Sequence, residues 1–192
     1  MPSSADPVAD ALRAAADAVA DAVRDHRDVA AVVLIDGRSG SGKSTLAARV
    51  AAAWPWRVGA DVLALDSVYP GWDGLAAGAA QVRDRVLRPR AEGVRAAWHR
   101  WDWVRDRAAE EHVVDPGRGL IVEGVGALDA DTAPLAPIRV WLESPADARR
   151  DRALARDGDA FRPHWERWAR QEEVHLAAHA PASFATHVFA VP

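Results

Sequence analysis

The chain has 192 residues, 49% of them hydrophobic and 27% charged, and it contains no cysteine. This is the composition of an ordinary globular protein, and the lack of cysteine excludes disulfides, thiolate metal sites and cysteine nucleophiles. The net charge of −4 lacks the basic character of nucleic-acid-binding proteins, although it leaves room for a local basic cleft. We therefore expect a single domain over residues 1–192 with no nucleic-acid partner, and the composition indicates no oligomeric state.

The N-terminal segment, residues 1–28, contains a predicted helix. Asp6 and Pro7 are typical of an N-cap and a first helical residue, and apolar residues recur at helical spacing through residues 7–27. The acidic residues Asp6 and Asp10 argue against a secretory or transit signal, and no apolar run approaches the length of a membrane span. We expect a cytoplasmic protein with no membrane partner, in which this helix covers a sheet.

Five short apolar segments predict buried β-strands, and helical patterns lie between them. The expected strands comprise residues 31–35, 61–65, 119–123, 138–142 and 187–191. One helix is expected at residues 43–53, and another starts at Ser144, an expected N-cap followed by Pro145 at the first helical position. Strands that alternate with helices predict a three-layer α/β fold, with a mostly parallel five-stranded sheet and helices on both faces.

A glycine-rich segment after the first strand has the pattern of a phosphate-binding loop. The sequence Gly37-Arg38-Ser39-Gly40-Ser41-Gly42-Lys43-Ser44 matches G-x-x-x-x-G-K-[ST] at every fixed position, between a strand and a helix as the motif requires. The glycines let successive amide N–H groups point inward at an anion, and the helix N-terminus adds its positive dipole end. The expected nucleotide-binding residues are Gly37, Ser39, Gly40, Ser41, Gly42, Lys43, Ser44 and Thr45.

This loop is expected to bind a nucleoside triphosphate, taken here as ATP, together with Mg²⁺, although the motif does not distinguish ATP from GTP. Lys43 is expected to reach the β and γ phosphates, and the Ser44 hydroxyl is expected to ligate the metal. Glu123 ends the third strand at the same sheet edge as the loop, so its carboxylate can face the Mg²⁺ or its water shell. The alternative for Glu123 is an exposed carboxylate at a strand end.

Two further features suit phosphoryl transfer. Asp66 follows the second strand at the same edge, where it could accept the proton of an acceptor hydroxyl; alternatively, it caps the following turn. An arginine-rich helical segment follows the fourth strand, and Arg152 and Arg156 share one helical face because they are four residues apart. These arginines could offset the charge that develops during transfer, or they could form a solvated face paired with Asp151 and Asp157.

Tryptophans are frequent in this chain, and Trp98, Trp101 and Trp103 are clustered. Trp101 and Trp103 have the spacing of two residues on one face of a strand. Together with Tyr69 and Trp72 they could line an acceptor pocket, because the face of a tryptophan stacks on a ring or a cation. The alternative is packing in the core or in a lid.

The predicted helix near the C-terminus offers a candidate metal site and a plainer alternative. His175 and His179 are four residues apart, which is a metal-ligand spacing, but no His-Glu-x-x-His pattern accompanies them. The alternative, which Glu172 and Glu173 suit equally well, is an ordinary solvated face of the helix. Its buried stripe is expected to comprise Trp165, Trp168 and Val174.

Several segments, taken in chain order, resemble those of the uridine kinases and related small-molecule kinases among the P-loop NTPases. They are the phosphate loop, Asp66-Ser67-Val68-Tyr69, Glu123-Gly124, the arginine-rich segment and Ala185-Thr186-His187-Val188-Phe189. The resemblance covers about residues 30–192, and the phosphate loop is its most specific part. It implies that Asp66 is the catalytic base and that Glu123 assists Mg²⁺. It also implies the strand order 2-3-1-4-5, and a mobile lid with Arg152 and Arg156 within a lid-and-helix region at about residues 145–180.

The segment Trp101-Asp102-Trp103 resembles the Tyr-Asp-Phe segment of that family, which contacts the acceptor nucleoside. With Asp66 and Tyr69, the residues Trp101 and Trp103 complete the expected acceptor-binding set. The sequence then departs from the family, because uridine kinases continue with a histidine that reads the pyrimidine, whereas this chain has Val104-Arg105-Asp106-Arg107. The resemblance therefore implies a kinase without identifying uridine as its acceptor.

These features favour a kinase that transfers the γ phosphate of ATP to a hydroxyl of a small molecule, for example a nucleoside. The expected catalytic residues are Lys43, Asp66, Arg152 and Arg156. Two alternatives remain: a nucleotide-dependent switch or regulatory ATPase, and a degenerate kinase fold that only binds ATP. An aspartate beside an aromatic pocket favours the kinase, because a switch needs no acceptor site.

Overall fold

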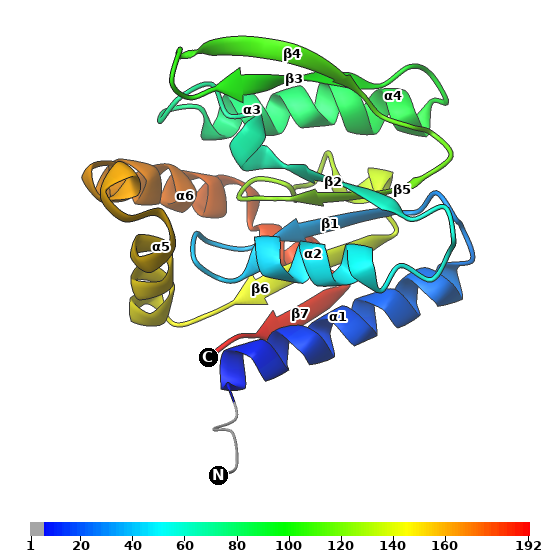
Figure 1. Ribbon diagram of the computed structural model, residues 1–192, viewed down its shortest axis with the longest axis horizontal. Helices are drawn as coiled ribbons and strands as arrows, with labels where there is room; N and C mark the ends of the chain where they lie inside the picture. The colour runs from blue at the N-terminus through cyan, green and yellow to red at the C-terminus, as the bar shows by residue number, and fades with distance from the viewer. Residues whose placement is uncertain (1–5) are drawn as a thin grey trace.

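The first apolar run forms the central strand of a parallel sheet. The computed structural model describes residues 6–192 and arranges five parallel strands in the order β2-β5-β1-β6-β7 (Figure 1). The strands are β1 (Val32–Asp36), β2 (Ala60–Ala64), β5 (Gly119–Glu123), β6 (Ile138–Glu143) and β7 (His187–Ala190). Counted among the five expected strands, this is the order 2-3-1-4-5, so the parallel sheet and its strand order are confirmed.

Helices cover both faces of this sheet, which confirms the three-layer α/β fold (Figure 1). One face carries α1 (Pro7–His26) and α2 (Lys43–Ala52). The other face carries α3 (Leu75–Val82), its continuation through a π-helical turn (Arg83–Leu87) into α4 (Arg88–Ala91), and α6 (Trp165–His179). Four short 3₁₀ helices connect these elements: η1 (Leu65–Ser67), η3 (Ala133–Leu135), η4 (Arg162–His164) and η5 (Pro181–Phe184).

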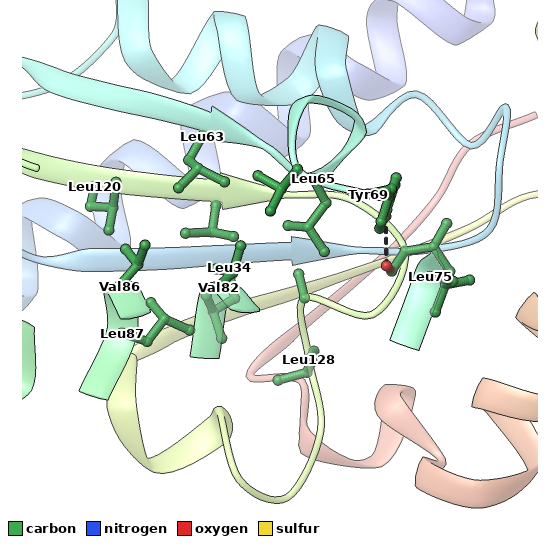
Figure 2. Packing of buried hydrophobic residues seen from close by; sticks show 14 of the residues in the cluster. Leu34, Leu63, Leu65, Tyr69, Leu75, Val82, Val86, Leu87, Leu120 and Leu128 are labelled. Atoms are coloured by element: carbon green, nitrogen blue, oxygen red, sulfur yellow. Dashed lines mark hydrogen bonds between the residues drawn. The ribbon is translucent and has the colours of Figure 1, made fainter. Parts of the chain in front are cut away.

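Alternate side chains of β1 divide the core into two halves. Leu34 packs with Leu63 and Leu120 on the face covered by α3 (Figure 2), whereas Val33 and Ile35 pack toward α1 and α2. Every residue of β1 and of β5 is buried. A strand covered on both faces needs apolar side chains in both directions, which is why these strands are continuous apolar runs in the sequence.

The helix α1 begins where the sequence predicts. The Asp6 carboxylate accepts hydrogen bonds from the backbone N–H groups of Val8 and Ala9, at 3.1 and 3.2 Å, and Pro7 occupies the first turn. The helix ends at His26 because Arg27 adopts a left-handed conformation with φ of 60°. Within residues 6–192 no helix combines the length and the apolar character needed to cross a membrane.

A two-stranded antiparallel hairpin, β3 (Ala97–Asp102) and β4 (Arg107–Val113), lies outside the main sheet and was not predicted. Its strands are half-buried or exposed and mix charged with aromatic residues, so they lack a continuous apolar run. β3 ends at Asp102, whose carboxylate accepts the backbone N–H groups that follow it, and Trp103 therefore lies in the turn. The expectation that Trp101 and Trp103 share a strand face is wrong for this reason.

The helix α5 (Ala146–Phe161) begins later than expected and is kinked near its end. Pro145 occupies its N-cap position with no side-chain cap, so the predicted cap at Ser144 is wrong. The Ser144 hydroxyl instead receives a hydrogen bond from Arg152. Gly158 interrupts the helix with φ of 52° and ψ of −133°, a conformation that favours glycine. Helices α5 and α6 together fill the region of residues 145–180.

Candidate active site

The phosphate loop connects β1 to α2 at the carboxyl edge of the sheet, and its glycines are structurally required. Gly40 has φ of 78°, and a Cβ atom there would lie 2.0 Å from the carbonyl oxygen of Arg149. Gly42 has φ of 103° and lies directly against Leu12 of α1. Any larger residue at either position would force the loop away from its neighbours. The loop is therefore fixed by contact with α5 on one side and α1 on the other.

A small cavity of about 50 Å³ lies inside the loop and gathers most of the residues expected to act on the triphosphate. It is lined by Ser39, Gly40, Gly42, Lys43, Ser44, Thr45, Asp66, Glu123, Val125 and Arg156. Lys43 is buried, and its ammonium group donates to the carbonyl oxygen of Arg38 at 3.1 Å. Gly37 and Ser41 do not line this cavity, and the Ser41 hydroxyl is buried without a partner.

Glu123 is a buried carboxylate at the end of β5, only 4% exposed. The alternative of an exposed carboxylate is therefore wrong. Burial raises the pKa of Glu123 above its ordinary value, the ammonium of Lys43 opposes this rise, and Asp66 adds to it. With the Ser44 hydroxyl it forms a pair of oxygen donors on the cavity wall. Oxygen donors are what Mg²⁺ prefers, so the residues present fit this metal.

Asp66 lies in the 3₁₀ turn η1 directly after β2, and its carboxylate is exposed toward the cavity. Its backbone carbonyl accepts a hydrogen bond from the indole N–H of Trp103 at 2.8 Å, which ties this turn to the hairpin. Among the described residues no backbone N–H donates to the Asp66 carboxylate, so the structure gives no support for a capping role.

The arginines of α5 divide between two tasks. Arg149 donates to the carbonyl oxygens of Ser39 and Ser144, each at 3.1 Å. Arg152 donates to the carbonyl oxygen of Gly40 at 2.8 Å and also binds Ser144 and Pro192. Both guanidinium groups therefore donate hydrogen bonds to backbone carbonyl oxygens on the outer side of the phosphate loop.

Arg156, one turn further along α5, is the arginine that reaches the cavity. It is paired with Asp157, with 2.7 Å between Nη2 and Oδ2, and it lies near Asp66 and Glu123. The expected pair of guanidinium groups over the triphosphate is therefore not formed. Arg156 lines the cavity, whereas Arg152 is hydrogen-bonded to the backbone of the loop. The alternative of a solvated arginine paired with a neighbouring aspartate holds in part for Arg156, which is 55% exposed.

Glu172 on α6 also holds the loop, so its expected place on a solvated helix face is wrong. The side chain is 1% exposed, and its two oxygens accept the Ser39 amide N–H at 2.8 Å and the Arg38 Nε–H at 2.9 Å. The buried stripe of α6 comprises Trp168, Glu172 and His175, whereas Val174 is 69% exposed. The spacing of four residues from Trp168 to Glu172 was the available signal, because such residues share a helical face.

Asp36 is a second buried carboxylate that the sequence analysis missed. It is fully buried at the end of β1 and accepts hydrogen bonds from the amides of Gly37, Gly126 and Leu128, at 2.6, 3.1 and 3.0 Å. It thereby joins the start of the phosphate loop to the loop after β5. An aspartate inside a run of buried strand residues was the signal for this role.

The two histidines of α6 lie side by side, with ring centroids 5.0 Å apart, and His175 Nε2 is 3.8 Å from Asp36 Oδ2. In the part of the chain that the structure describes, no group of three or more histidine, cysteine or acidic residues could hold a metal ion. The structure therefore gives no support for a zinc site here.

A larger cavity of about 530 Å³ adjoins the phosphate cavity and shares Ser39, Asp66 and Arg156 with it. Its remaining lining residues are Tyr69, Trp72, Trp103, Asp157, Ala160, Phe161 and Trp168. The Tyr69 hydroxyl donates to the carbonyl oxygen of Val125 at 2.7 Å, and burial raises its pKa well above the ordinary value, so this phenol stays protonated. Trp101 does not line this cavity, and its indole nitrogen is buried without a partner.

The comparisons with known proteins place the fold. No protein-family model and no curated protein matches the sequence. Among solved structures, a Bacillus stearothermophilus protein described as a possible uridine kinase superposes with a TM-score of 0.67 at 17% identity, over 93% of this chain and 98% of that one. A candidate fructose transport system kinase from Silicibacter sp. TM1040 superposes with a TM-score of 0.60 at 23% identity, over 92% and 98% of the two chains. The protein has a P-loop kinase-like fold.

The contacts of Glu172 give a first prediction. Glu172→Ala should lower the free energy of unfolding by about 1–3 kcal/mol, because the partly buried Ser39 amide and the Arg38 Nε–H each lose an acceptor. Glu172→Gln keeps an acceptor for the amide and should lose less. Urea denaturation measures both, with Glu173→Ala as the control, because Glu173 is 66% exposed and its 3.7 Å ion pair with Arg38 lies at the surface, where it contributes little. Equal losses for Glu172→Ala and Glu173→Ala would contradict the assignment.

The raised pKa of Glu123 gives a second prediction. The folded protein binds the Glu123 proton more tightly than the unfolded chain, so its ionisation reduces stability as pH rises from the ordinary carboxyl pKa through the raised value. Glu123→Gln should therefore melt at a higher temperature than the wild type at neutral pH, and this advantage should shrink toward about pH 4. Thermal melts without Mg²⁺ or nucleotide measure it. A wild-type advantage that grows with pH would count against the argument.

Proposed function

We propose that the protein is an ATP-dependent kinase that phosphorylates a hydroxyl of a small-molecule acceptor. The observation that carries this proposal is that Asp66 and Arg156 line both cavities at once. A phosphate-binding loop on one side and an aromatic cavity on the other leave these two residues at the boundary where a phosphoryl group would cross. The kinase-like fold agrees with this arrangement, although the fold by itself does not specify a function.

The phosphate loop would hold the triphosphate through its amide N–H groups and Lys43. Lys43 would move from its contact with the Arg38 carbonyl to the β and γ phosphates, a short shift because it already lines the phosphate cavity. Ser44 and Glu123 would hold Mg²⁺, which supplies positive charge to the phosphate oxygens when it is bound. A buried carboxylate with a raised pKa becomes fully ionised when such a cation is placed beside it.

Asp66 would accept the proton of the acceptor hydroxyl as that oxygen forms its bond to the γ phosphorus and ADP leaves. Its carboxylate is free of hydrogen bonds from the following turn, and its backbone is held by Trp103. Arg156 would stabilise the charge that develops on the transferred group, for which its pairing with Asp157 must loosen. Arg149 and Arg152 would act indirectly by fixing the loop backbone.

The end of α5, which follows Arg156, would act as the lid. Gly158 lies two residues after Arg156 in a non-helical conformation, and a Cβ atom there would meet nothing within 4 Å. The backbone at this point is therefore sterically free to change its angles. Because Arg149 and Arg152 anchor the start of α5 to the phosphate loop, closure about Gly158 would move the residues that follow it, such as Phe161, over the cavity and exclude water from the transfer.

A regulatory ATPase or a binding module fits the site less well than a kinase. Neither activity requires a second cavity beside the phosphate loop, and a cavity of about 530 Å³ is large enough for a small molecule. The direct test is to incubate the purified protein with Mg²⁺-ATP and a panel of nucleosides, sugars and vitamin-like alcohols, and to follow ADP release. Release that requires an acceptor supports the kinase, whereas acceptor-independent release or tight ATP binding without turnover contradicts it.

Substitutions of Lys43 and Asp66 should impair different steps, ATP binding in one case and phosphoryl transfer in the other. Lys43→Ala is predicted to weaken ATP binding and abolish turnover, because the ammonium group contacts the phosphates. Asp66→Asn is predicted to leave the ATP dissociation constant within about twofold while lowering kcat by about 10²- to 10⁴-fold, because it removes only the base. Calorimetric titration with ATP and a coupled ADP assay measure the two properties. Unchanged ATP affinity in Lys43→Ala would be incompatible with this placement of the lysine.

The two arginines of α5 should also separate. Arg156→Ala is predicted to lower kcat by about 10³-fold with little change in melting temperature, because Arg156 acts on developing charge. Arg152→Ala is predicted to lower the free energy of unfolding by about 1–3 kcal/mol, because it leaves the Gly40 carbonyl unpaired. Its loss of kcat should be smaller. The reverse ranking, with Arg152→Ala more damaging to kcat at unchanged stability, would assign the transfer role to Arg152.

A further inference from the structure

A separate large cavity lies between α3 and α6, on the face of the sheet that these helices cover (Figure 1). Its volume is about 640 Å³, and it shares no lining residue with the phosphate cavity or the aromatic cavity. Four alanines form much of its apolar wall: Ala76, Ala79, Ala80 and Ala178. Such small side chains leave space between the two helices, and the proposed kinase reaction makes no use of this space.

Most of the charged and amide side chains of this cavity already have partners. Asp73 is ion-paired with Arg167, and Arg83 is ion-paired with the aspartate that follows it. The Asp129 carboxylate accepts hydrogen bonds from two backbone N–H groups of the following turn, at 2.9 and 2.8 Å. Gln171 donates to a backbone carbonyl oxygen at 2.7 Å. Among the described residues, no carboxylate that lines this cavity is therefore without a partner.

The side chains of the cavity that lack partners are basic. Arg170 is exposed at the rim, and within residues 6–192 no carboxylate lies within ion-pairing distance of it. His175 is only 7% exposed, and its Nε2 atom is buried without a hydrogen bond, since Oδ2 of Asp36 is 3.8 Å away. His179 lies beside His175, with ring centroids 5.0 Å apart. A guanidinium group and two imidazoles are complemented by an anion.

We propose that the cavity between α3 and α6 binds a small organic anion. Its carboxylate or phosphate group pairs with Arg170, and its apolar body lies along the alanines toward His175 and His179. Arg170 is suited to this task because a guanidinium group is always charged and matches both kinds of anion through paired N–H groups. The inference goes beyond the proposed kinase function and does not rest on it.

The need for an apolar body follows from the wall between these basic groups. Residues 170 and 175 are five positions apart on α6, so they are separated by roughly 7–8 Å along the helix axis. A bare phosphate or acetate ion at Arg170 would leave the alanines in contact with water. A chain of several methylene groups would instead bury apolar surface against them, which is favourable.

The test follows the imidazole signals of the protein by NMR while small probes are added. Hexanoate and hexyl phosphate carry an anionic group on an apolar chain, acetate lacks the chain, and hexanol lacks the charge. Hexanoate should shift the signals of His175 and His179 in a saturable way and leave that of His112, in the hairpin, unchanged. It should bind at least about tenfold more tightly than acetate and at least about fivefold more tightly than hexanol.

The probes also identify the source of the charge and the results that would overturn the inference. The tighter of hexanoate and hexyl phosphate distinguishes a carboxylic acid from a phosphate ester. Hexanol binding as tightly as hexanoate overturns the inference, because the cavity would then recognise only the chain. Acetate binding as tightly as hexanoate overturns it as well, because the alanine wall would then contribute nothing. Tighter binding of hexylammonium indicates a cation site, and saturable binding by neither anion refutes the proposal directly.

Substitution of Arg170 tests the charged end of the site. Arg170→Ala should weaken hexanoate binding at least about fivefold, and Arg170→Lys, which keeps the charge, should lose less. Arg150→Ala is the matched control, because Arg150 is an exposed arginine of α5 that does not line this cavity. Equal losses in Arg170→Ala and Arg150→Ala would indicate a general effect of surface charge and contradict the site.

Substitution of an alanine tests the apolar end. Ala80→Leu should weaken hexanoate binding at least about fivefold, because the larger side chain fills space that the ligand needs. Ala77→Leu is its control, since Ala77 is exposed on the same helix and does not line the cavity. Thermal melts verify that each variant is folded, and the Arg170 comparison decides the question if Ala80→Leu is not. Unchanged affinity in a folded Ala80→Leu protein overturns the inference.

A competition experiment separates this cavity from the phosphate loop, which also attracts anions. Hexanoate should bind equally well with and without saturating ATP. Displacement by ATP, together with unchanged affinity in Arg170→Ala, would place the anion in the phosphate loop and overturn the inference. Neither Arg170 nor Ala80 lines the phosphate cavity or the aromatic cavity, so failure of this proposal would leave the kinase proposal standing.

Discussion

The outer side of the phosphate loop is tied to the rest of the protein, and these contacts would orient the donors on its inner side before an anion arrives. Arg149 and Arg152 bind its carbonyl oxygens, and Glu172 binds the Ser39 amide. Asp36 fixes the loop where it leaves β1. Donors that are already oriented bind a charge without first paying the cost of rearrangement, so these contacts on the outside determine what the inside can do.

Glu123 illustrates the cost of such a site. A carboxylate buried beside another carboxylate is disfavoured in its charged form, and Lys43 compensates only in part. The protein therefore carries a local electrostatic imbalance that a bound cation would remove. Burial of the Glu123 carboxylate thus lowers the stability of the ligand-free protein, and a bound cation would restore it. Functional sites commonly show this trade-off between stability and binding.

Much of the fold could be read from the sequence, because the strands of a sheet covered on both faces are continuous apolar runs and the phosphate loop has a nearly unique pattern. The β3–β4 hairpin was not predicted, because its half-exposed strands form no continuous apolar run and carry no sequence motif. At the site, the local motif residues Lys43, Ser44, Asp66 and Glu123 were brought together as the strand ends required. The partners of Arg152 and Glu172 were not readable, because they depend on which loop atoms lie across from a helix. Spacing could have indicated only that Glu172 shares a buried helical face with Trp168. The spacing of Trp101 and Trp103 predicted that they share a strand face. Trp103 instead lies in the turn after β3, so the two side chains are separated.

The hairpin has a further consequence for how this protein can diversify. It contributes no strand to the central sheet, yet the turn at its end supplies both a wall of the aromatic cavity and a hydrogen bond to the backbone of Asp66. Residues in an exposed turn can be exchanged at little expense to folding. Substitutions in this turn could therefore change the lining of the aromatic cavity during evolution, while the central sheet and the phosphate loop stay unchanged.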